Sequence, residues 1–433
     1  MKKNIKIFLL FFIFSSIIFY FHVIDLDEIW SYGFTYNISR GLIPYKEFNM
    51  VVSPLYNLLF AIPLKIFGNY LLVYKLSHAF LYSFIFTLAY QRLGKKSFLL
   101  PIAVAIQSSP CWYNTFIAVL TLFILIILDS NSKYKNLIIG LTIGIIVMTK
   151  HNVGLPLLLV YFITSKEKTK SLLYFFIPVL ISFIYLYINK AVYNYIDICF
   201  LGIGNFMNNL MSYKVVLLLT IALLIYLVKK YLDTKDNKLL YILAFSTIIF
   251  PLFEPVHFSF IIVPLSYYIL LKEKNEIVYK SLYIFIIFAV IANLISIDYL
   301  NTKIIKKNNS FKYLRIEKNT INYMEKYTNY INNIEGNVYL FTGSAYLIRI
   351  YNNQTPSFTD LINEGNLGSN NKKYLDEIDE KCKTEKCSFI VDKILFKKRV
   401  KGVQLLESYK DYVVDNYKYV EDLPTKDRLY NNY

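Results

Sequence analysis

Histidine, cysteine, tryptophan and glycine are scarce in this chain of 433 residues, which has 4 histidines, 4 cysteines, 2 tryptophans and 14 glycines. No GxxxxGKT, GxGxxG or GxSxG element occurs, so nucleotide hydrolysis and serine hydrolase chemistry have no support. Cys382 and Cys387 are spaced CxxxxC without histidine partners, which is a poor zinc pattern. The sequence therefore indicates no metal ligands and identifies no cofactor.

Apolar residues, in contrast, are abundant: 56% of the chain is hydrophobic and the mean hydropathy is +0.41. Apolar runs recur from residue 5 to residue 297, and most of them are near bilayer length. Residues 298–433 are polar and contain no run long enough to cross a membrane. We predict an α-helical polytopic membrane protein with a membrane domain, 1–297, and a soluble C-terminal α/β domain, 298–433.

The membrane domain is predicted to have eleven spans, and the loop charges predict their orientation. We place the spans at about 5–24, 70–91, 97–110, 115–129, 136–149, 153–164, 171–189, 213–230, 239–252, 256–271 and 277–297. Residues 54–68 are apolar but short, and we expect them to form a hairpin at the outer interface instead. The first run is followed by no small-x-small cleavage site, so we expect it to remain as an uncleaved helix.

Of the 25 Lys and Arg residues in the membrane domain, 18 fall in loops on the same side as the N-terminus. The positive-inside rule then places the N-terminus in the cytoplasm and the C-terminal domain outside the plasma membrane. The net charge of +17 does not indicate nucleic acid, because the C-terminal domain has 22 basic residues against 18 acidic ones. No nucleic-acid-binding motif accompanies the charge.

This orientation gathers most of the unusual polar residues at the outer ends of the spans. Asp27 and Glu28 follow the first span, where an acidic pair is costly to desolvate. A solvated helix end, or pairing with Arg40 or Lys46, would account for them. A carboxylate there is also suited to take a proton from an attacking hydroxyl as a general base.

Two further outer turns carry cationic or histidine side chains. Lys150 and His151 interrupt two apolar segments, and they oppose the positive-inside trend. Snorkelling accounts for a single lysine at a span end, whereas adjacent donors suit a lipid-linked phosphate. Glu254 and His257 flank a proline break, where a hydrogen-bonded turn histidine is the simplest interpretation and a phosphate or acceptor contact the next.

The remaining candidates are packing, acceptor or disulfide residues. Trp112, Tyr113 and Asn114 form another outer turn. Cys111 and Cys199 are isolated and are expected to pack in the interior. Cys382 and Cys387 are expected to form a local disulfide if the compartment is oxidising.

These motifs resemble the GT-C superfamily of membrane glycosyltransferases, and in particular the bacterial protein-O-mannosyltransferase-like and aminoarabinose-transferase-like enzymes. The resemblance is carried by Asp27-Glu28 after the first helix, Gly41-x-x-Pro44-Tyr45-x-x-Phe48, Ser53-Pro54-Leu55, Lys150-His151-Asn152-x-Gly154 and Glu254-Pro-Val-His257. The chain departs from many relatives after Asp-Glu, where it has Ile29 and Trp30, and this leaves the acceptor type open.

The resemblance implies transfer of a sugar from a polyprenyl-phosphate donor to a cell-envelope acceptor. Asp27 would be the general base, with Glu28 orienting it or binding an acceptor or metal. Lys150, His151 and His257 would hold the donor phosphate. Tyr45, Trp112, Tyr113, Asn114 and Glu254 would line the acceptor side. A polysaccharide polymerase or ligase, a lipid-linked glycan flippase, and a membrane assembly protein with a sensory tail are the alternatives.

In the C-terminal domain we expect a helix at 311–333, a strand at 338–341, a helix at 374–381 and a strand at 388–391. Residues 360–368 are expected to form a loop.

Overall fold

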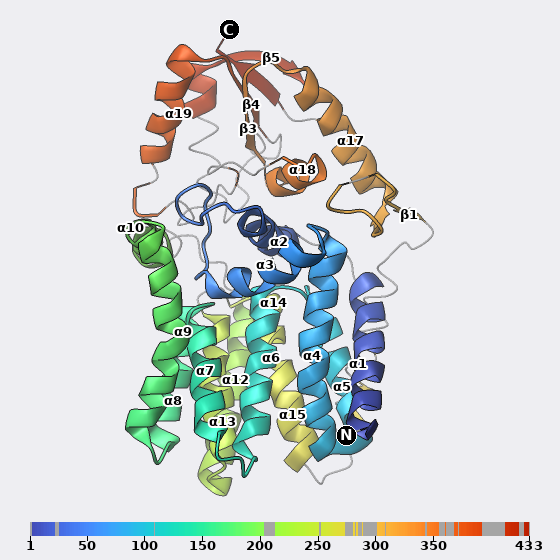
Figure 1. The fold of residues 1–433 in the computed structure, drawn as a ribbon, viewed down its shortest axis with the longest axis vertical. Helices are drawn as coiled ribbons and strands as arrows, with labels where there is room; N and C mark the ends of the chain where they lie inside the picture. Colours follow the sequence, from blue (N-terminus) through green and yellow to red (C-terminus); the bar gives the residue numbers. More distant parts are fainter. Residues whose placement is uncertain are drawn as a thin grey trace.

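The computed structural model shows a bundle of helices with a smaller mixed domain at one end (Figure 1). It describes residues 2–432 except 22–25, 108, 203–212, 251–252, 273–279, 282, 285–287, 289–300, 308, 343, 355–359, 361–367, 371, 392–411 and 424–427. The N-terminus lies at the opposite end of the bundle from the C-terminal domain (Figure 1). We call the end of the bundle with the N-terminus the basic end, and the end that carries the C-terminal domain the domain end.

Apolar helices form the bundle, and five of the described ones are long and apolar enough to cross a membrane. These five are α1 (Lys2–Phe21), the continuous stretch Leu71–Ala105 containing α4 (Leu71–Leu93) and α5 (Leu99–Ala105), α9 (Lys168–Ile188), α12 (Lys214–Thr234), and Pro255–Lys272 containing α14 (Pro255–Ser259) and α15 (Ile262–Lys272). Shorter apolar helices pack among them: α6 (Tyr113–Leu128), α7 (Lys135–Val147), α8 (His151–Thr164) and α13 (Asn237–Phe245).

The observed helices follow most of the predicted spans, with two differences in length. The predicted span 97–110 is a 3₁₀ helix, Gly94–Phe98, followed by the seven residues of α5. The predicted span 239–252 is α13 and a 3₁₀ turn, Ser246–Ile249. The hydropathy pattern did not reveal these short helices, because apolar loops and apolar helix ends have the same composition. Most of the predicted span 277–297 lies outside the described residues.

Loops rich in lysine meet at the basic end, as their charges predicted. Arg92 donates to the carbonyl of Asp129 at 2.8 Å, and Lys238 forms an ion pair with the Asp129 carboxylate at 2.6 Å. Lys272, at the end of α15, pairs with Asp236 at 3.3 Å. The loops that follow α4, α6, α12 and α15 therefore share one end of the bundle.

Two helices lie across the domain end, between the bundle and the C-terminal domain (Figure 1). They are α2 (Leu26–Ser39) and α3 (Leu55–Phe67), which pack on each other. Residues 54–68 were predicted to form a hairpin at the outer interface; they form one helix that lies across the domain end, and the outward orientation of this end stays a prediction. A short helix α10 (Val192–Ile196) continues into a π-helical turn, Asp197–Leu201.

The C-terminal domain is built on a four-stranded sheet in the order β3-β4-β6-β5. Strands β3 (Asn337–Phe341) and β4 (Cys387–Val391) are parallel, and β6 (Arg428–Asn431) is antiparallel to β4 and to β5 (Lys418–Asp422). All five residues of β4 are buried, as a central strand requires. The helices are α17 (Lys318–Asn333), α18 (Ala345–Tyr351) and α19 (Lys372–Thr384).

The two predicted strands and the helix around 374–381 are present, but the helix predicted at 311–333 is shorter than expected. Residues Arg315–Glu317 form β2, which pairs with β1 (Thr302–Ile304), and α17 begins only at Lys318. The partner strand lies outside any local window, so helical periodicity could not reveal this pairing. Cys382 and Cys387 form a disulfide with Cα atoms 5.6 Å apart. Most of the predicted loop 360–368 lies outside the described residues.

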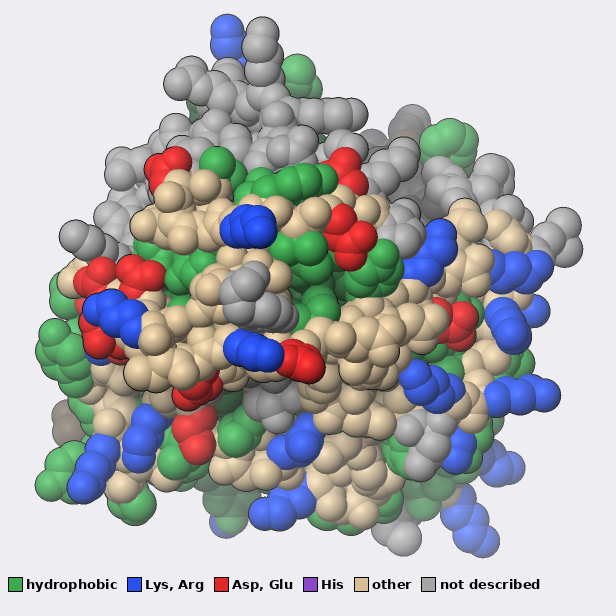
Figure 2. Space-filling model, turned by 90° about the horizontal axis from the view of Figure 1, so that it is seen from above, with side chains coloured by type: hydrophobic (Ala, Val, Ile, Leu, Met, Phe, Trp, Pro, Cys, Tyr) green, Lys and Arg blue, Asp and Glu red, His purple; other side chains and the backbone are tan. Residues whose placement is uncertain are grey.

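The outer surface of the C-terminal domain carries charges of both signs. Seen from the domain end, basic and acidic side chains lie close together over much of the described surface (Figure 2). Exposed pairs such as Lys386–Glu335 and Lys383–Glu380 are examples of this mixture. A surface of this kind agrees with the nearly balanced charge of the domain's sequence.

Helix α18 docks the C-terminal domain on α2. The Tyr346 ring packs edge-on against Phe34, with centroids 5.5 Å apart, and the Tyr346 hydroxyl donates to the Asn49 carbonyl at 3.3 Å. Gly33 makes room for this ring, because a Cβ atom there would lie 2.3 Å from Tyr346 Cδ1. The contact therefore needs glycine at position 33 for space and not for an unusual backbone.

Gly33→Ala is expected to lower the free energy of unfolding by about 1–3 kcal/mol, because the buried Tyr346 ring has little room to move away. Thermal unfolding of the purified protein measures the loss. Combining Gly33→Ala with Tyr346→Ala provides the control: the two losses should then be less than additive. Additive losses would show that the Gly33–Tyr346 contact is not the cause.

Candidate functional site

Seven of the predicted site residues come together at the domain end, beneath α2. They are Asp27, Trp112, Tyr113, Asn114, Lys150, Glu254 and His257, and we call them the Lys150 cluster. They come from four separate segments: the first turn of α2, the start of α6, the turn between α7 and α8, and the start of α14. The turns next to α6 and between α7 and α8 reach this end because these helices run along the bundle axis, whereas α2 lies across it (Figure 1).

Lys150 occupies the tight turn between α7 and α8, outside both helices. Its backbone is extended, and its amide donates to the Ile146 carbonyl at 2.7 Å. The two helices approach closely here because position 154 is glycine: a Cβ atom there would lie 2.5 Å from the backbone of Val147. Gly154 thus fixes the turn from which the Lys150 side chain extends.

The start of α6 holds the Lys150 ammonium. Lys150 Nζ donates to Asn114 Oδ1 at 2.9 Å and lies 5.7 Å from the centre of the Tyr113 ring, within reach of a cation–π interaction. Asn114 is fully buried, so its amide is well placed to hold the lysine in one orientation.

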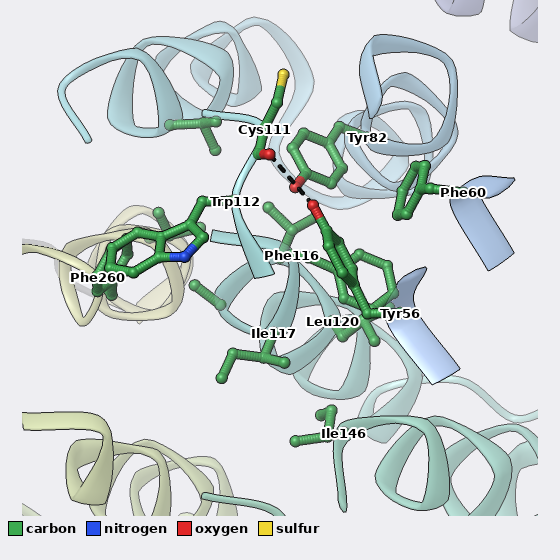
Figure 3. Close-up of a cluster of buried hydrophobic side chains, with 14 of the residues drawn as sticks. Tyr56, Phe60, Tyr82, Cys111, Trp112, Phe116, Ile117, Leu120, Ile146 and Phe260 are labelled. Atoms are coloured by element: carbon green, nitrogen blue, oxygen red, sulfur yellow. Dashed lines mark hydrogen bonds between the residues drawn. The ribbon is translucent and has the colours of Figure 1, made fainter. Parts of the chain in front are cut away.

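The turn before α6 is itself anchored in the bundle. The Tyr56 hydroxyl donates to the Cys111 carbonyl at 3.1 Å, and the Trp112 indole packs against Phe260 with centroids 5.5 Å apart (Figure 3). Tyr56 in turn is hydrogen-bonded to His78 Nε2 at 2.9 Å. Cys111 is a buried free cysteine, as predicted, and Cys199 is another.

Glu254 and His257 form a pair across the first turn of α14. His257 Nδ1 lies 2.5 Å from Glu254 Oε1, so the carboxylate fixes the orientation of the ring. The ring also meets the edge of Trp112, with centroids 6.0 Å apart. His257 is thereby joined to the same group as Lys150.

Burial and the neighbouring carboxylates shift the pKa of Lys150 in opposite directions. Burial lowers the pKa of the Lys150 ammonium to about 7, against the charges of Glu254 and Asp27, which favour its protonated form. Asp27 lies in the first turn of α2, partly exposed, and is close enough for its charge to act on Tyr113 as well. Two carboxyl groups and a lysine with a lowered pKa thus share one partly buried site, a combination typical of functional sites.

Glu28 lies apart from this group and is tied to α4. Its carboxylate forms an ion pair with Lys75 at 3.3 Å, and both side chains are almost completely buried. Lys75 also donates to the Phe19 carbonyl at the end of α1 at 3.0 Å. The pair therefore joins α1, α2 and α4 next to Asp27, and it replaces the pairing with Arg40 or Lys46 that the sequence suggested.

Lys75 is one of the seven basic residues of the membrane domain that lie outside the loops on the side of the N-terminus, and no function was predicted for it. A lysine within the first turn and a half of an apolar span was the available signal, because such a charge needs a partner. Arg40 instead donates to the Tyr36 hydroxyl at 3.0 Å and to the Asn353 carbonyl at 3.1 Å.

His151 and Tyr45 point elsewhere. The His151 ring stacks on Phe200, with centroids 4.6 Å apart, on the side of the π-helical turn. Tyr45 is fully buried, and its hydroxyl donates to the Val52 carbonyl at 2.5 Å while its ring packs against Tyr195. The structure gives Tyr45 a packing role and leaves His151 beside, not within, the Lys150 cluster. Across the described residues, no three His, Cys, Asp or Glu side chains are grouped as metal ligands.

Comparisons with known proteins give structural matches only. No family model and no curated protein matches the chain. It is similar to the archaeal oligosaccharyltransferase AglB from Archaeoglobus fulgidus in complex with an inhibitory peptide and a dolichol-phosphate, with a TM-score of 0.43 and 11% identity over 98% of this chain and 74% of that one. A second similar structure is the Archaeoglobus fulgidus oligosaccharyltransferase in complex with Zn and sulfate, with a TM-score of 0.38 and 13% identity over 97% of this chain and 72% of that one.

Both of these neighbours are oligosaccharyltransferases. At these TM-scores and identities the similarity assigns no residue, ligand or activity to this chain.

Proposed function

We propose that this protein is an integral membrane glycosyltransferase that moves a sugar from a polyprenyl-phosphate donor to an acceptor outside the cytoplasm. The observation that carries the proposal is the Lys150 cluster, in which one half-buried lysine is held by Asn114 and lies within reach of the charges of Glu254 and Asp27. A lipid-linked donor fits this position, because nucleotide sugars are scarce outside the cell and no nucleotide-binding pattern occurs in the sequence.

In the proposed reaction an acceptor hydroxyl oxygen attacks the anomeric carbon of the donor in a single displacement, which inverts that carbon. Asp27 takes the hydroxyl proton, and the bond between the anomeric carbon and the phosphate oxygen breaks. Polyprenyl phosphate leaves with the bonding electrons. The leaving group is already a good one, so a positioned base and a charge on the phosphate are sufficient.

Lys150 is proposed to bind the donor phosphate, with His257 as a further contact. An ammonium that is partly stripped of water binds an anion more strongly than one in bulk water. Asn114 would keep this ammonium in place between turnovers. Tyr113 is half-buried and offers an aromatic ring beside it, on which the apolar face of a sugar can pack, and the buried Trp112 packs edge-on against that ring. His151 would contact the donor only from the outside of the cluster.

Glu28 is proposed as a positioning residue rather than a second base. Its ion pair with Lys75 holds the first turn of α2 against α4, and Asp27 is the neighbouring residue in that turn. Removing one partner of a buried ion pair leaves the other charge uncompensated, so the turn would not keep its place.

A transfer assay tests the proposal against its alternatives. Vesicles containing the protein receive a radiolabelled polyprenyl-phosphate sugar and a cell-envelope acceptor fraction. We expect label to move from lipid to acceptor. Label that crosses the bilayer without leaving the lipid would indicate a flippase, and label that does neither would refute the proposal.

The proposed role of Lys150 also predicts a pH dependence. An ordinary lysine stays charged beyond pH 10, whereas Lys150, with a pKa of about 7, loses its proton as the pH rises through that value. The phosphodiester of the donor keeps its charge throughout this range. We therefore expect kcat/KM for the donor to fall as the pH rises through about 7. In Lys150→Arg, which stays charged, the fall should disappear; a fall of the same size in both proteins would contradict the assignment.

A further inference from the structure

The basic end of the bundle holds a second polar site, at the opposite end from the Lys150 cluster. A cavity of about 440 Å³ opens between the ends of α7, α8, α12 and α13. Four lysines from three segments line it: Lys135 at the start of α7, Lys166 after α8, and Lys235 and Lys238 at the junction of α12 and α13. Asp236 is the one carboxylate of its lining, so the side chains around it have a formal charge of +3.

Two of these lysines are already engaged. Lys238 pairs with Asp129 at 2.6 Å and with Asp236 at 3.6 Å, and Lys135 donates to the Leu128 carbonyl at 2.5 Å. Asp236 is shared further, since Lys272 also binds it. The acidic charge near the cavity is therefore used by lysines that hold the helix ends together.

The other two lysines carry the unbalanced charge. Within the described part of the chain, neither Lys166 nor Lys235 has a carboxylate within ion-pair distance. Lys166 is exposed in the turn after α8, and Lys235 follows α12, with its ammonium 5.7 Å from the centre of the Tyr231 ring. Both side chains are long enough to reach a ligand in the cavity between them.

Hydroxyl groups complete the lining of the cavity, and like the lysines they can bind an anion. Thr164 and Tyr241 share a hydrogen bond at 3.2 Å, and Ser165 shares one with Ser171 at 2.6 Å. Hydroxyls rotate and can donate to an anion without carrying charge. The positive-inside rule explains lysines in these loops, but it does not require four of them to converge on one cavity.

We propose that this cavity binds a phosphate ester, supplied either by the headgroup of an anionic phospholipid or by a soluble phosphate compound. Its volume lies within the roughly 300–1,000 Å³ of ordinary ligand sites. Basic pockets between helix ends at the cytoplasmic surface recognise lipid headgroups in this way. The site is separate from the proposed reaction, because it lies at the other end of the bundle.

Ligand-dependent thermal unfolding tests this site, using the full-length protein in phosphatidylcholine nanodiscs. One arm adds phosphatidylglycerol to the bilayer, and the other adds glycerol 3-phosphate to the buffer. The test variant is Lys166→Gln/Lys235→Gln. The control variant, Lys95→Gln/Lys229→Gln, removes the same charge from exposed lysines of the basic end that do not line the cavity.

We expect one arm to stabilise the wild type and the control alike, and the test variant to bind that ligand on the order of 10- to 30-fold more weakly. The arm that responds identifies the source of the phosphate. Equal stabilisation of the test and control variants would mean that the ligand is attracted by the overall charge of the basic end and not bound in the cavity, and it would overturn the proposal. Absence of stabilisation in both arms would also overturn it.

Discussion

Asp27→Asn is expected to lower the rate of sugar transfer by on the order of 10²- to 10⁴-fold, because asparagine cannot accept the proton of the attacking hydroxyl. Asparagine has nearly the same shape, and the ion pair between Glu28 and Lys75 remains to hold the turn. We therefore expect kcat to fall while KM for the donor changes little. Steady-state kinetics with labelled donor in vesicles measures both.

Glu47→Gln is the matched control for this substitution. Glu47 is also a carboxylate of the segment that links α2 and α3, but it accepts a hydrogen bond from the Ile43 amide at 2.6 Å and takes no part in the Lys150 cluster. Removing its charge is expected to leave kcat within a factor of about two, as for a surface change away from the site. If Glu47→Gln and Asp27→Asn lost the same activity, a general charge effect would replace the base assignment.

Lys150→Gln is expected to raise KM for the donor by roughly 10- to 100-fold, since a hydrogen bond to a charged group is worth about 1.5–3 kcal/mol. Glutamine can still bond to Asn114 but supplies no charge to the phosphate. The loss should therefore appear mainly in donor binding. A titration of donor against initial rate, with the protein in vesicles, separates KM from kcat.

Lys214→Gln provides the comparison, because Lys214 is an exposed lysine at the start of α12 and at the same end of the bundle. It should leave KM unchanged. A rise in KM in both variants would mean that general attraction of the anionic donor, and not binding at Lys150, causes the effect. Lys150→Arg should retain most of the donor binding.

The grouping of these turns at one end of the bundle was predictable from the sequence, because it depends on charges in loops; that this end faces outward stays a prediction. Lysines in the loops indicated which helix ends lie at the same end of the bundle. The turns containing Lys150 and Glu254 were therefore predicted to lie together at the other end. The structure brings both turns to the start of α6, where Lys150 bonds to Asn114 and His257 meets Trp112.

The contacts within the site were not predictable, because they depend on how helices cross. Glu28 meets Lys75 only because α2 lies over the start of α4, and nothing in either segment specifies that crossing. His151 and Lys150 are neighbours in sequence, yet the His151 ring stacks on Phe200 while the Lys150 ammonium binds Asn114. In the C-terminal domain, β2 likewise depends on a distant strand, β1.

The most direct test of the account follows a single turnover from bound donor. Wild type and Asp27→Asn are loaded with radiolabelled polyprenyl-phosphate sugar in vesicles, freed of excess donor and mixed with acceptor. We expect both proteins to retain the same amount of donor, and only the wild type to release polyprenyl phosphate and label the acceptor. Transfer from Asp27→Asn at the wild-type rate would contradict this expectation.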